Sequence, residues 1–151
     1  MTADYHQAQR TWGANCGPAT IAGFFDLPMS EVRALVMPEF ARLGHVSREL
    51  MASVLERLGV RYVSGSEWPT QGIVSIRWMQ ACESGLARHE AYRAGTQGHW
   101  IGVRGGQVFD SYDACRWQDR ARWEREVLPV LTGIERPEWP LWRVGVALTC
   151  S

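Results

Sequence analysis

The spacing of hydrophobic residues changes near residue 60, and this change constrains the fold more than any other feature of the chain. Before it, apolar residues recur at helical intervals, as in the stripe formed by Leu50, Met51, Val54, Leu55 and Leu58. After it, short runs rich in Val, Ile and Trp are separated by Gly and Pro, which is typical of strands. Helices followed by consecutive strands predict an α+β fold with N-terminal helices packed on a C-terminal antiparallel sheet.

The boundaries of the predicted elements follow from capping and turn residues. Ser30 is expected to cap a helix that runs through Val36, and Ser47 one that Gly59 ends. The other expected helices cover residues 16–25 and 119–131, the second perturbed at Pro129. The expected strands cover residues 60–63, 72–78 and 141–148, with two more inside 98–112 around a turn at 105–106. The N-terminal segment that contains His6 is expected to be loose, and residues 82–97 are expected to form a loop near the hairpin.

Length and charge limit the classes of function. The chain has 151 residues, which we expect to form one domain spanning residues 1–151. Sixteen cationic residues, all Arg, balance sixteen acidic ones, so no basic excess favours a nucleic-acid partner. No apolar run is long enough to cross a membrane, and residues 1–10 contain no secretion signal. We therefore expect a cytoplasmic protein, unless it is packaged in a virion or delivered by other machinery. The sequence predicts no oligomeric state.

The four cysteines are too widely spaced for a shared structural role. Cys16, Cys82, Cys115 and Cys150 form no CxxC pair, which argues against a zinc site and against a disulfide framework. The last three are expected to be small buried hydrophobic residues. Cys16 is expected to differ from them because of its place in the segment TWGANCGPATIAGFF.

Cys16 occupies the predicted first position of a helix. Asn15 is a strong N-cap residue, and Pro18 falls in the first turn, where its missing N–H has no cost. The unpaired N–H groups and the dipole of a helix N-terminus favour a negative charge, which a thiolate supplies. Gly17, Ala19, Ala22 and Gly23 are small and let another element approach closely. This pattern indicates a reactive thiol.

The predicted hairpin places a histidine and a carboxylate on one face of the sheet. With Gly105 and Gly106 as a two-residue turn, Val103 faces Val108 and Ile101 faces Asp110. His99 and Asp110 are then diagonal neighbours, within reach of each other's side chains. A slip of one residue would put Asp113 or Ser111 on the face of the histidine instead, and Asp113 is the alternative orienting group. We expect the helix that begins at Cys16 to cover this face, so that a nucleophile, a base and an orienting group converge.

The other three histidines show no such pattern. His6 lies in a segment expected to be loose, His45 in a turn and His89 in the polar loop. Each is expected to be solvated.

In motif order, the segments NCGPA, GHWIGV and VFDSYD make the chain resemble the papain-like cysteine peptidases over residues 9–113. The resemblance is nearest to small bacterial proteins related to the double-glycine leader peptidases and to phage-encoded papain-like proteins. It implies a papain-like fold in which Cys16 is the nucleophile, His99 the general base and acid, and Asp110 the orienting group. These families also use a Gln before the Cys to bind the oxyanion. Arg10 stands at the usual spacing here, and Gln9, one residue further away, is the candidate if the chain bulges at Gly13.

The resemblance leads to three hypotheses of function. The first is a thiol hydrolase that cleaves peptide or isopeptide bonds in a peptide or protein substrate, with no metal or organic cofactor. The second keeps the triad in a peptidoglycan amidase, a transglutaminase-like enzyme or an acyltransferase. The third is a catalytically impaired binding module in which Trp12, Trp78 and Trp100 line a peptide groove.

Overall fold

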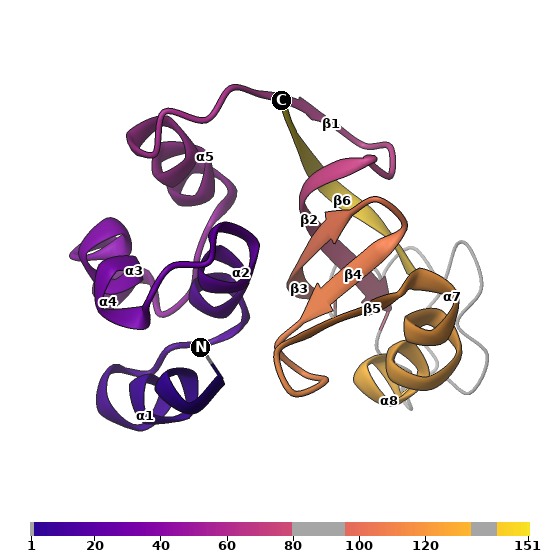
Figure 1. The fold of residues 1–151 in the computed structure, drawn as a ribbon, viewed down its shortest axis with the longest axis horizontal. Coiled ribbons are helices and arrows are strands. Elements are labelled where there is room, and N and C mark those ends of the chain that lie inside the picture. The colour runs from indigo at the N-terminus through magenta and orange to yellow at the C-terminus, as the bar shows by residue number, and fades with distance from the viewer. Residues whose placement is uncertain (1, 80–95, 134–141) are drawn as a thin grey trace.

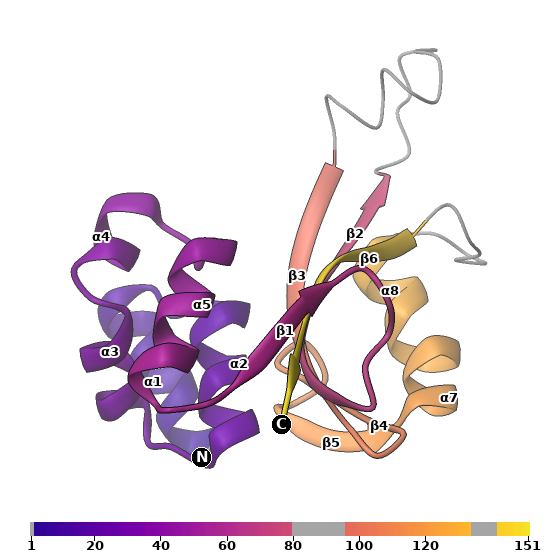
Figure 2. The same ribbon diagram turned by 90° about the horizontal axis from the view of Figure 1, so that it is seen from above.

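A six-stranded antiparallel sheet separates two helical layers in this computed structural model, which describes residues 2–79, 96–133 and 142–151 (Figure 1). The strands lie in the order β1-β6-β2-β3-β4-β5, so the C-terminal strand pairs between β1 and β2. Figure 2 shows the N-terminal helices on one face of the sheet and the later helical run on the other. The α+β class predicted from the sequence is confirmed, with one helical run inserted before the last strand.

The element bounds are as follows. The first layer contains α1 (Thr2–Trp12), α2 (Cys16–Phe25), α3 (Met29–Val36), α4 (Glu39–Leu43) and α5 (Arg48–Arg57). The sheet contains β1 (Tyr62–Gly65), β2 (Gln71–Met79), β3 (Thr96–Arg104), β4 (Gln107–Asp110), β5 (Arg116–Asp119) and β6 (Trp142–Cys150). The second layer is a continuous helical run of α7 (Arg120–Arg122), a π-helical segment η1 (Trp123–Val127) and α8 (Leu128–Thr132). Among the described residues, no helix is long and apolar enough to cross a membrane.

Several local predictions are wrong, each for a local reason. Residues before Cys16 form helix α1, because Tyr5, Ala8 and Trp12 place apolar side chains on one face that packs into the core. Helix α3 begins at Met29 directly after Pro28, so Ser30 lies inside it and is not its cap. Strand β1 begins later than expected, at Tyr62. Short elements without a clear periodic pattern, α4 and β5, were not predicted.

Other local predictions are confirmed. Ser47 caps α5, and its side chain accepts a hydrogen bond from the Leu50 backbone N–H at 3.1 Å. The hairpin has the predicted register, with Gly102 opposite Phe109 and Val103 opposite Val108. Gly105 and Gly106 both have positive φ angles, of 52° and 79°, as a two-residue hairpin turn of this kind requires. The pairing ends at Phe109, so β3 runs on toward His99 without β4 beside it.

Helix α2 packs on the face of the sheet opposite to the predicted one. Ile101, Val103 and Val108 lie in one apolar cluster with Trp123 and Leu128 of the second helical layer. Helix α2 packs instead against the alternate residues of these strands, which point to the other face of the sheet and include Trp100 and Phe109. Both faces of the sheet are buried, and the residues from 120 onward supply the second cover. The expectation that α2 covers Ile101, Val103 and Val108 is therefore wrong.

The small residues of α2 have the role that the sequence predicts for them. A Cβ atom on Gly23 would lie 2.1 Å from Cζ of Phe109, and one on Gly17 would lie 2.4 Å from Cγ2 of Val46. These two glycines let the helix approach the sheet on one side and the segment before α5 on the other. Close packing of α2 holds its first turn, and with it Cys16, against the rest of the site.

Candidate active site

Cys16 is the first residue of α2, as predicted. Asn15 has extended backbone geometry, and its side-chain oxygen accepts a hydrogen bond from the Gly17 N–H at 3.2 Å. The same side chain donates to the carbonyl oxygen of Gly44 at 3.1 Å, which ties the helix start to the loop before α5. Cys16 is half-buried, with its thiol at the edge of a cavity. A helix N-terminus stabilises the negative charge of a thiolate at this position.

A hydrogen bond between α2 and β3 brings Cys16 to His99. The hydroxyl of Thr20 donates to the carbonyl oxygen of Trp100 at 2.9 Å. Cys16 lies one helical turn before Thr20 and therefore on the same side of α2. His99 precedes Trp100 on the part of β3 that β4 leaves unpaired, and its imidazole lines the same cavity as the Cys16 thiol and interacts with it electrostatically. This position lets Cys16 and His99 meet although α2 covers the opposite face.

The imidazole of His99 is bonded to Asp110. Its Nε2 atom lies 2.6 Å from Oδ1 of Asp110, and both side chains are buried. The backbone N–H of Tyr112 donates to the same Oδ1 at 2.8 Å, and the indole N–H of Trp123 donates to Oδ2 at 2.8 Å. These contacts hold the carboxylate, and through it the ring, in one orientation. Because Nε2 is bonded to Asp110, Nδ1 is the ring nitrogen that remains for the thiol of Cys16.

Asp113, the alternative orienting group, lies in a different cluster. Its carboxylate accepts hydrogen bonds from the side chains of Arg116 at 3.0 Å and Gln118 at 2.8 Å. The hairpin has the unslipped register, and this directs Asp110 rather than Asp113 toward His99.

The protonation of the three groups is coupled. Burial raises the pKa of Cys16, but the hydrogen bond and charge of His99, with a hydrogen bond from the backbone of Trp100, lower it below its ordinary value. Burial lowers the pKa of His99, but its bonds to Asp110 and Cys16 raise the pKa to about 10. Burial raises the pKa of Asp110, yet the bonds from His99, Trp123 and Tyr112 lower it overall. The arrangement favours a thiolate, an imidazolium and a carboxylate together.

Two other cysteines have the opposite electrostatic setting. Burial raises the pKa of Cys115 to about 11, with a further increase from the nearby charge of Asp110. Burial also raises the pKa of Cys150. Both thiols are buried, as the sequence predicts. Cys82 lies outside the described residues.

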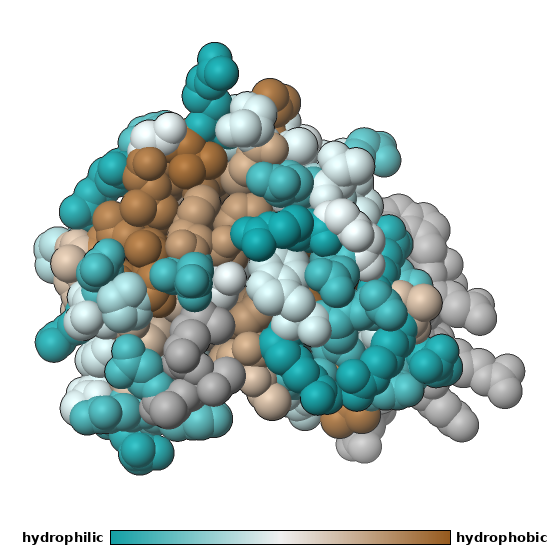
Figure 3. All heavy atoms as spheres, viewed as in Figure 1, coloured by the Kyte–Doolittle hydropathy of each residue, from teal (hydrophilic) through white to brown (hydrophobic). Residues whose placement is uncertain are grey.

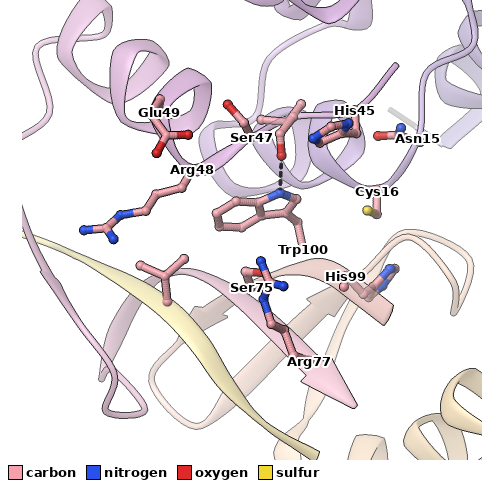
Figure 4. Close-up of a pocket in the computed structure, with 13 residues that line it drawn as sticks. Asn15, Cys16, His45, Ser47, Arg48, Glu49, Ser75, Arg77, His99 and Trp100 are labelled. Carbon is pink, nitrogen blue, oxygen red and sulfur yellow. Dashed lines mark hydrogen bonds between the residues drawn. The ribbon is translucent and has the colours of Figure 1, made fainter. Parts of the chain in front are cut away.

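A cavity of about 760 Å³ opens beside the thiol and the imidazole (Figure 4). Helix α5 and the loop before it form one wall, and β2, β3 and β6 form the other. The indole N–H of Trp100 donates to the carbonyl oxygen of Val46 at 2.7 Å and so links the two walls. The polar or charged side chains that line the cavity, besides Cys16 and His99, belong to Asn15, His45, Ser47, Arg48, Glu49, Ser75 and Arg77.

Gln9 does not reach this cavity. It is exposed on α1, and the helix continues unbroken to Trp12, with no bulge that would bring Gln9 to Cys16. Gly13 follows the helix with a φ of 78° and only turns the chain toward Asn15. The prediction of Gln9 as an oxyanion donor is therefore corrected. In the described part of the chain, the Cys16 backbone N–H makes no hydrogen bond, and it is the donor best placed beside the thiol.

The remaining candidates from the sequence fall in different places. His45 is exposed as expected, but it lines the cavity, which the sequence did not indicate. His6 is exposed on α1. Trp12 packs edge-on against Phe40, and Trp78 is buried in the second apolar cluster, so of the three predicted groove tryptophans only Trp100 lines the cavity. His89 lies outside the described residues.

Trp123 is the site residue that sequence reasoning missed most clearly. It is fully buried and donates to Asp110 from a helical segment that was predicted without a role. The π-helical turn that contains it is a rare conformation that often occurs near functional sites, and no sequence pattern signals it.

The described residues contain no group of His, Cys, Asp or Glu side chains arranged to hold a metal ion. Comparison with protein-family models, with curated proteins and with solved structures finds no match to this chain.

Proposed function

We propose that this protein is a papain-like thiol hydrolase that cleaves peptide or isopeptide bonds through a Cys16–His99–Asp110 triad. The observation that carries the proposal is the chain of contacts from the helix-terminal thiol through a buried imidazole to a buried carboxylate. The 2.6 Å bond between His99 and Asp110 orients the ring, and the lowered pKa of Cys16 favours the thiolate, which is the nucleophile. A lowered thiol pKa and an oriented base are what acyl transfer by a cysteine requires.

In the first half of the proposed reaction, the Cys16 thiolate attacks the carbonyl carbon of the substrate. A C–S bond forms, and the carbonyl π electrons move to the oxygen. This oxygen accepts a hydrogen bond from the backbone N–H of Cys16. When the tetrahedral intermediate collapses, the C–N bond breaks, and the imidazolium of His99 gives its proton to the leaving amine. The products are an amine and a thioester on Cys16.

In the second half, the neutral imidazole takes a proton from water, and the resulting hydroxide attacks the thioester. The C–S bond breaks, which releases a carboxylic acid and restores the thiolate and imidazolium. Asp110 remains ionised throughout and holds the ring so that Nδ1 faces the thiol. A peptide or protein is the proposed substrate, because the cavity beside the thiol is large enough for several side chains.

The proposal is tested with a peptide mixture generated from a denatured proteome. The protein should produce new peptide N-termini, and a thioester adduct on Cys16 should be detectable by intact mass. Cys16→Ala should abolish both results. An adduct from small amides or esters without peptide cleavage would favour an amidase or acyltransferase with the same triad. No adduct and no cleavage would favour a papain-like binding module.

A further inference from the structure

The floor of the cavity is formed by β2 and its two neighbouring strands. Ser75 lies opposite Trp100 on β3 and opposite Val146 on β6. Arg77 is two residues further along β2, on the same face, and pairs with Gly98, the residue directly before His99. Arg77 is therefore placed beside the reactive pair, with a residue that has no side chain between them.

A bulge in β6 provides the space in which Arg77 lies. The pairing between β2 and β6 shifts between Ser75 and Ile76, so Gly145 is an extra residue in β6. A Cβ atom on Gly145 would lie 2.9 Å from Nε of Arg77 and 3.0 Å from its Cδ. The side chain thus crosses β6 at a point that only a glycine leaves open, and Figure 4 shows it reaching into the cavity.

Arg77 has no partner among the described residues. It is exposed, and neither a carboxylate nor a hydrogen-bond acceptor of the described chain binds its guanidinium. By contrast, the three arginines of the helical run that begins at Arg120 each form an ion pair with a glutamate. Hydrophilic residues gather on this part of the face seen in Figure 3. The guanidinium of Arg77 is therefore available to a ligand in the cavity.

Ser75 provides a hydroxyl on the same face of β2 that no described residue binds. Its side chain is only 7% exposed and lines the cavity, yet its hydroxyl makes no hydrogen bond to any described residue. Its oxygen is not among the buried polar atoms that lack a partner, so the hydroxyl is open to the cavity and can bind a ligand there. A donor of this kind next to a free guanidinium is a combination that a carboxylate satisfies, because an Arg fork binds both oxygens of a carboxylate.

The opposite wall adds one cation and one anion. Arg48 projects from the start of α5 and donates to the Ser64 hydroxyl at 2.9 Å, and its neighbour Glu49 makes no ion pair with a described residue. His45 is held through Nδ1 by the Leu43 carbonyl oxygen at 3.0 Å. The charge of Glu49 offsets that of one arginine, and the thiolate of Cys16 offsets the imidazolium of His99. The other arginine leaves the side chains that line the cavity with a net positive charge.

We infer that Arg77 and Ser75 form a subsite for a carboxylate carried by the substrate near the bond that is cleaved, with Arg48 strengthening the positive field. This inference rests on the proposed function, since it assigns the substrate class of the same site. The preferred substrates are acyl compounds with an acidic group, such as a peptide with an acidic residue beside the scissile bond.

The test uses two thiol reagents that differ by one charge: the bromoacetyl derivatives of glutamate α-amide and of glutamine α-amide. Each alkylates Cys16, and the ratio of their second-order rate constants reports carboxylate recognition. We expect the glutamate reagent to react about tenfold faster with the wild type, which corresponds to one charge-assisted hydrogen bond. The ratio should fall as salt is added, because Arg77 is exposed to solvent.

Variants distinguish the subsite from general electrostatics. Arg77→Gln should bring the ratio close to one, and Gly145→Ala should lower it by displacing the Arg77 side chain while the charge remains. Arg33→Gln, which removes an exposed arginine of α3 that does not line the cavity, should leave the ratio unchanged. A ratio that is the same in the wild type and Arg77→Gln overturns the inference.

The reaction with iodoacetamide, which is neutral, keeps the two proposals separate. Suppose that iodoacetamide labels Cys16 rapidly, but the ratio of the glutamate and glutamine reagents is the same with and without Arg77. The carboxylate subsite is then wrong, and the proposed function stands. If iodoacetamide labels Cys16 no faster than Cys115 and Cys150, the proposed function fails.

Discussion

Nε2 of His99 lies 2.6 Å from Oδ1 of Asp110, and this contact joins the end of β4 to the part of β3 that pairs with β2 but not with β4. Because Asp110 occupies one ring nitrogen, the other is oriented toward Cys16. The same carboxylate also accepts the N–H groups of Tyr112 and Trp123. Trp123 of the second helical layer is thus linked, through Asp110 and His99, to the thiol at the start of α2.

Removing the charge of Asp110 should weaken the thiolate. Asp110→Asn keeps the size of the side chain but removes the negative charge that raises the pKa of His99. The pKa of Cys16 should then rise, and its alkylation rate near pH 6 should fall about tenfold, which is the effect of one pKa unit. A pH–rate profile with iodoacetamide measures both. Asp113→Asn is the matched control, since Asp113 does not contact His99, and an equal effect of both variants would contradict this role.

The same carboxylate should make stability depend on pH in the acid range. Bonds from His99, Trp123 and Tyr112 place the pKa of Asp110 in the folded protein below the value of 3.8 expected for the unfolded chain. This contribution to the free energy of unfolding is therefore present above 3.8 and is lost as the pH falls through the lower folded-state pKa.

Urea unfolding of the wild type and Asp110→Asn across the acid range measures this contribution. The wild type should lose more stability on acidification, so the gap between the two proteins should narrow. A gap that stays constant below pH 3.8 would show that Asp110 is not ionised with a lowered pKa.

Trp123 should act on the thiol without contacting it. Trp123→Phe removes the indole N–H that donates to Asp110 at 2.8 Å and leaves a buried carboxylate oxygen without its partner. We expect the free energy of unfolding to fall by about 1–3 kcal/mol and the pKa of Cys16 to rise. Thermal unfolding measures the first effect and the pH profile of alkylation the second.

Trp68→Phe is the control for Trp123→Phe. The Trp68 ring lies 6.1 Å from that of Trp123, but it has no bond to Asp110, so its replacement should leave the pH profile unchanged. If Trp123→Phe lowers stability but also leaves the profile unchanged, Trp123 is a packing residue only.

Gly23→Ala tests the close approach of α2 to the sheet. Alanine is favoured over glycine inside a helix by about 1 kcal/mol, which by itself would stabilise the protein. The added Cβ would lie 2.1 Å from the buried ring of Phe109, however, and overpacking of a core costs about 1–3 kcal/mol. We expect steric strain to prevail and the melting temperature to fall. A rise in melting temperature would contradict the packing described for this helix.

The sequence predicted the parts of the site that depend on local rules. The N-cap at Asn15 is a local feature, and it predicted that Cys16 begins a helix. The register of a hairpin with a two-residue turn is also local, and it predicted that His99 and Asp110 lie on one face of the sheet. The layer that covers each face depends on how distant segments pack. The sequence therefore gave no signal that residues from 120 onward cover Ile101, or that α2 lies on the other face.

The failures at Gln9 and Trp123 have related causes. The role of Gln9 depended on a bulge before Cys16, and helix α1 uses those residues for a regular apolar face instead. The role of Trp123 depends on a bond between elements far apart in the chain, and nothing in its neighbours indicates that bond. The cavity residue Arg77 was missed for the same reason, because it requires a bulge in β6, another strand.

The central claim is that Cys16 and His99 form a reactive thiolate–imidazolium pair, and alkylation by iodoacetamide tests it most directly. Labelling is followed near pH 6 by intact mass and peptide mapping in the wild type and in His99→Ala, because ordinary thiols react slowly at that pH. Cys115 and Cys150 are internal controls, since burial raises the pKa of both. We predict rapid labelling of Cys16 alone, lost in His99→Ala. Labelling of Cys16 no faster than that of Cys115 and Cys150, or unchanged in His99→Ala, would contradict the claim.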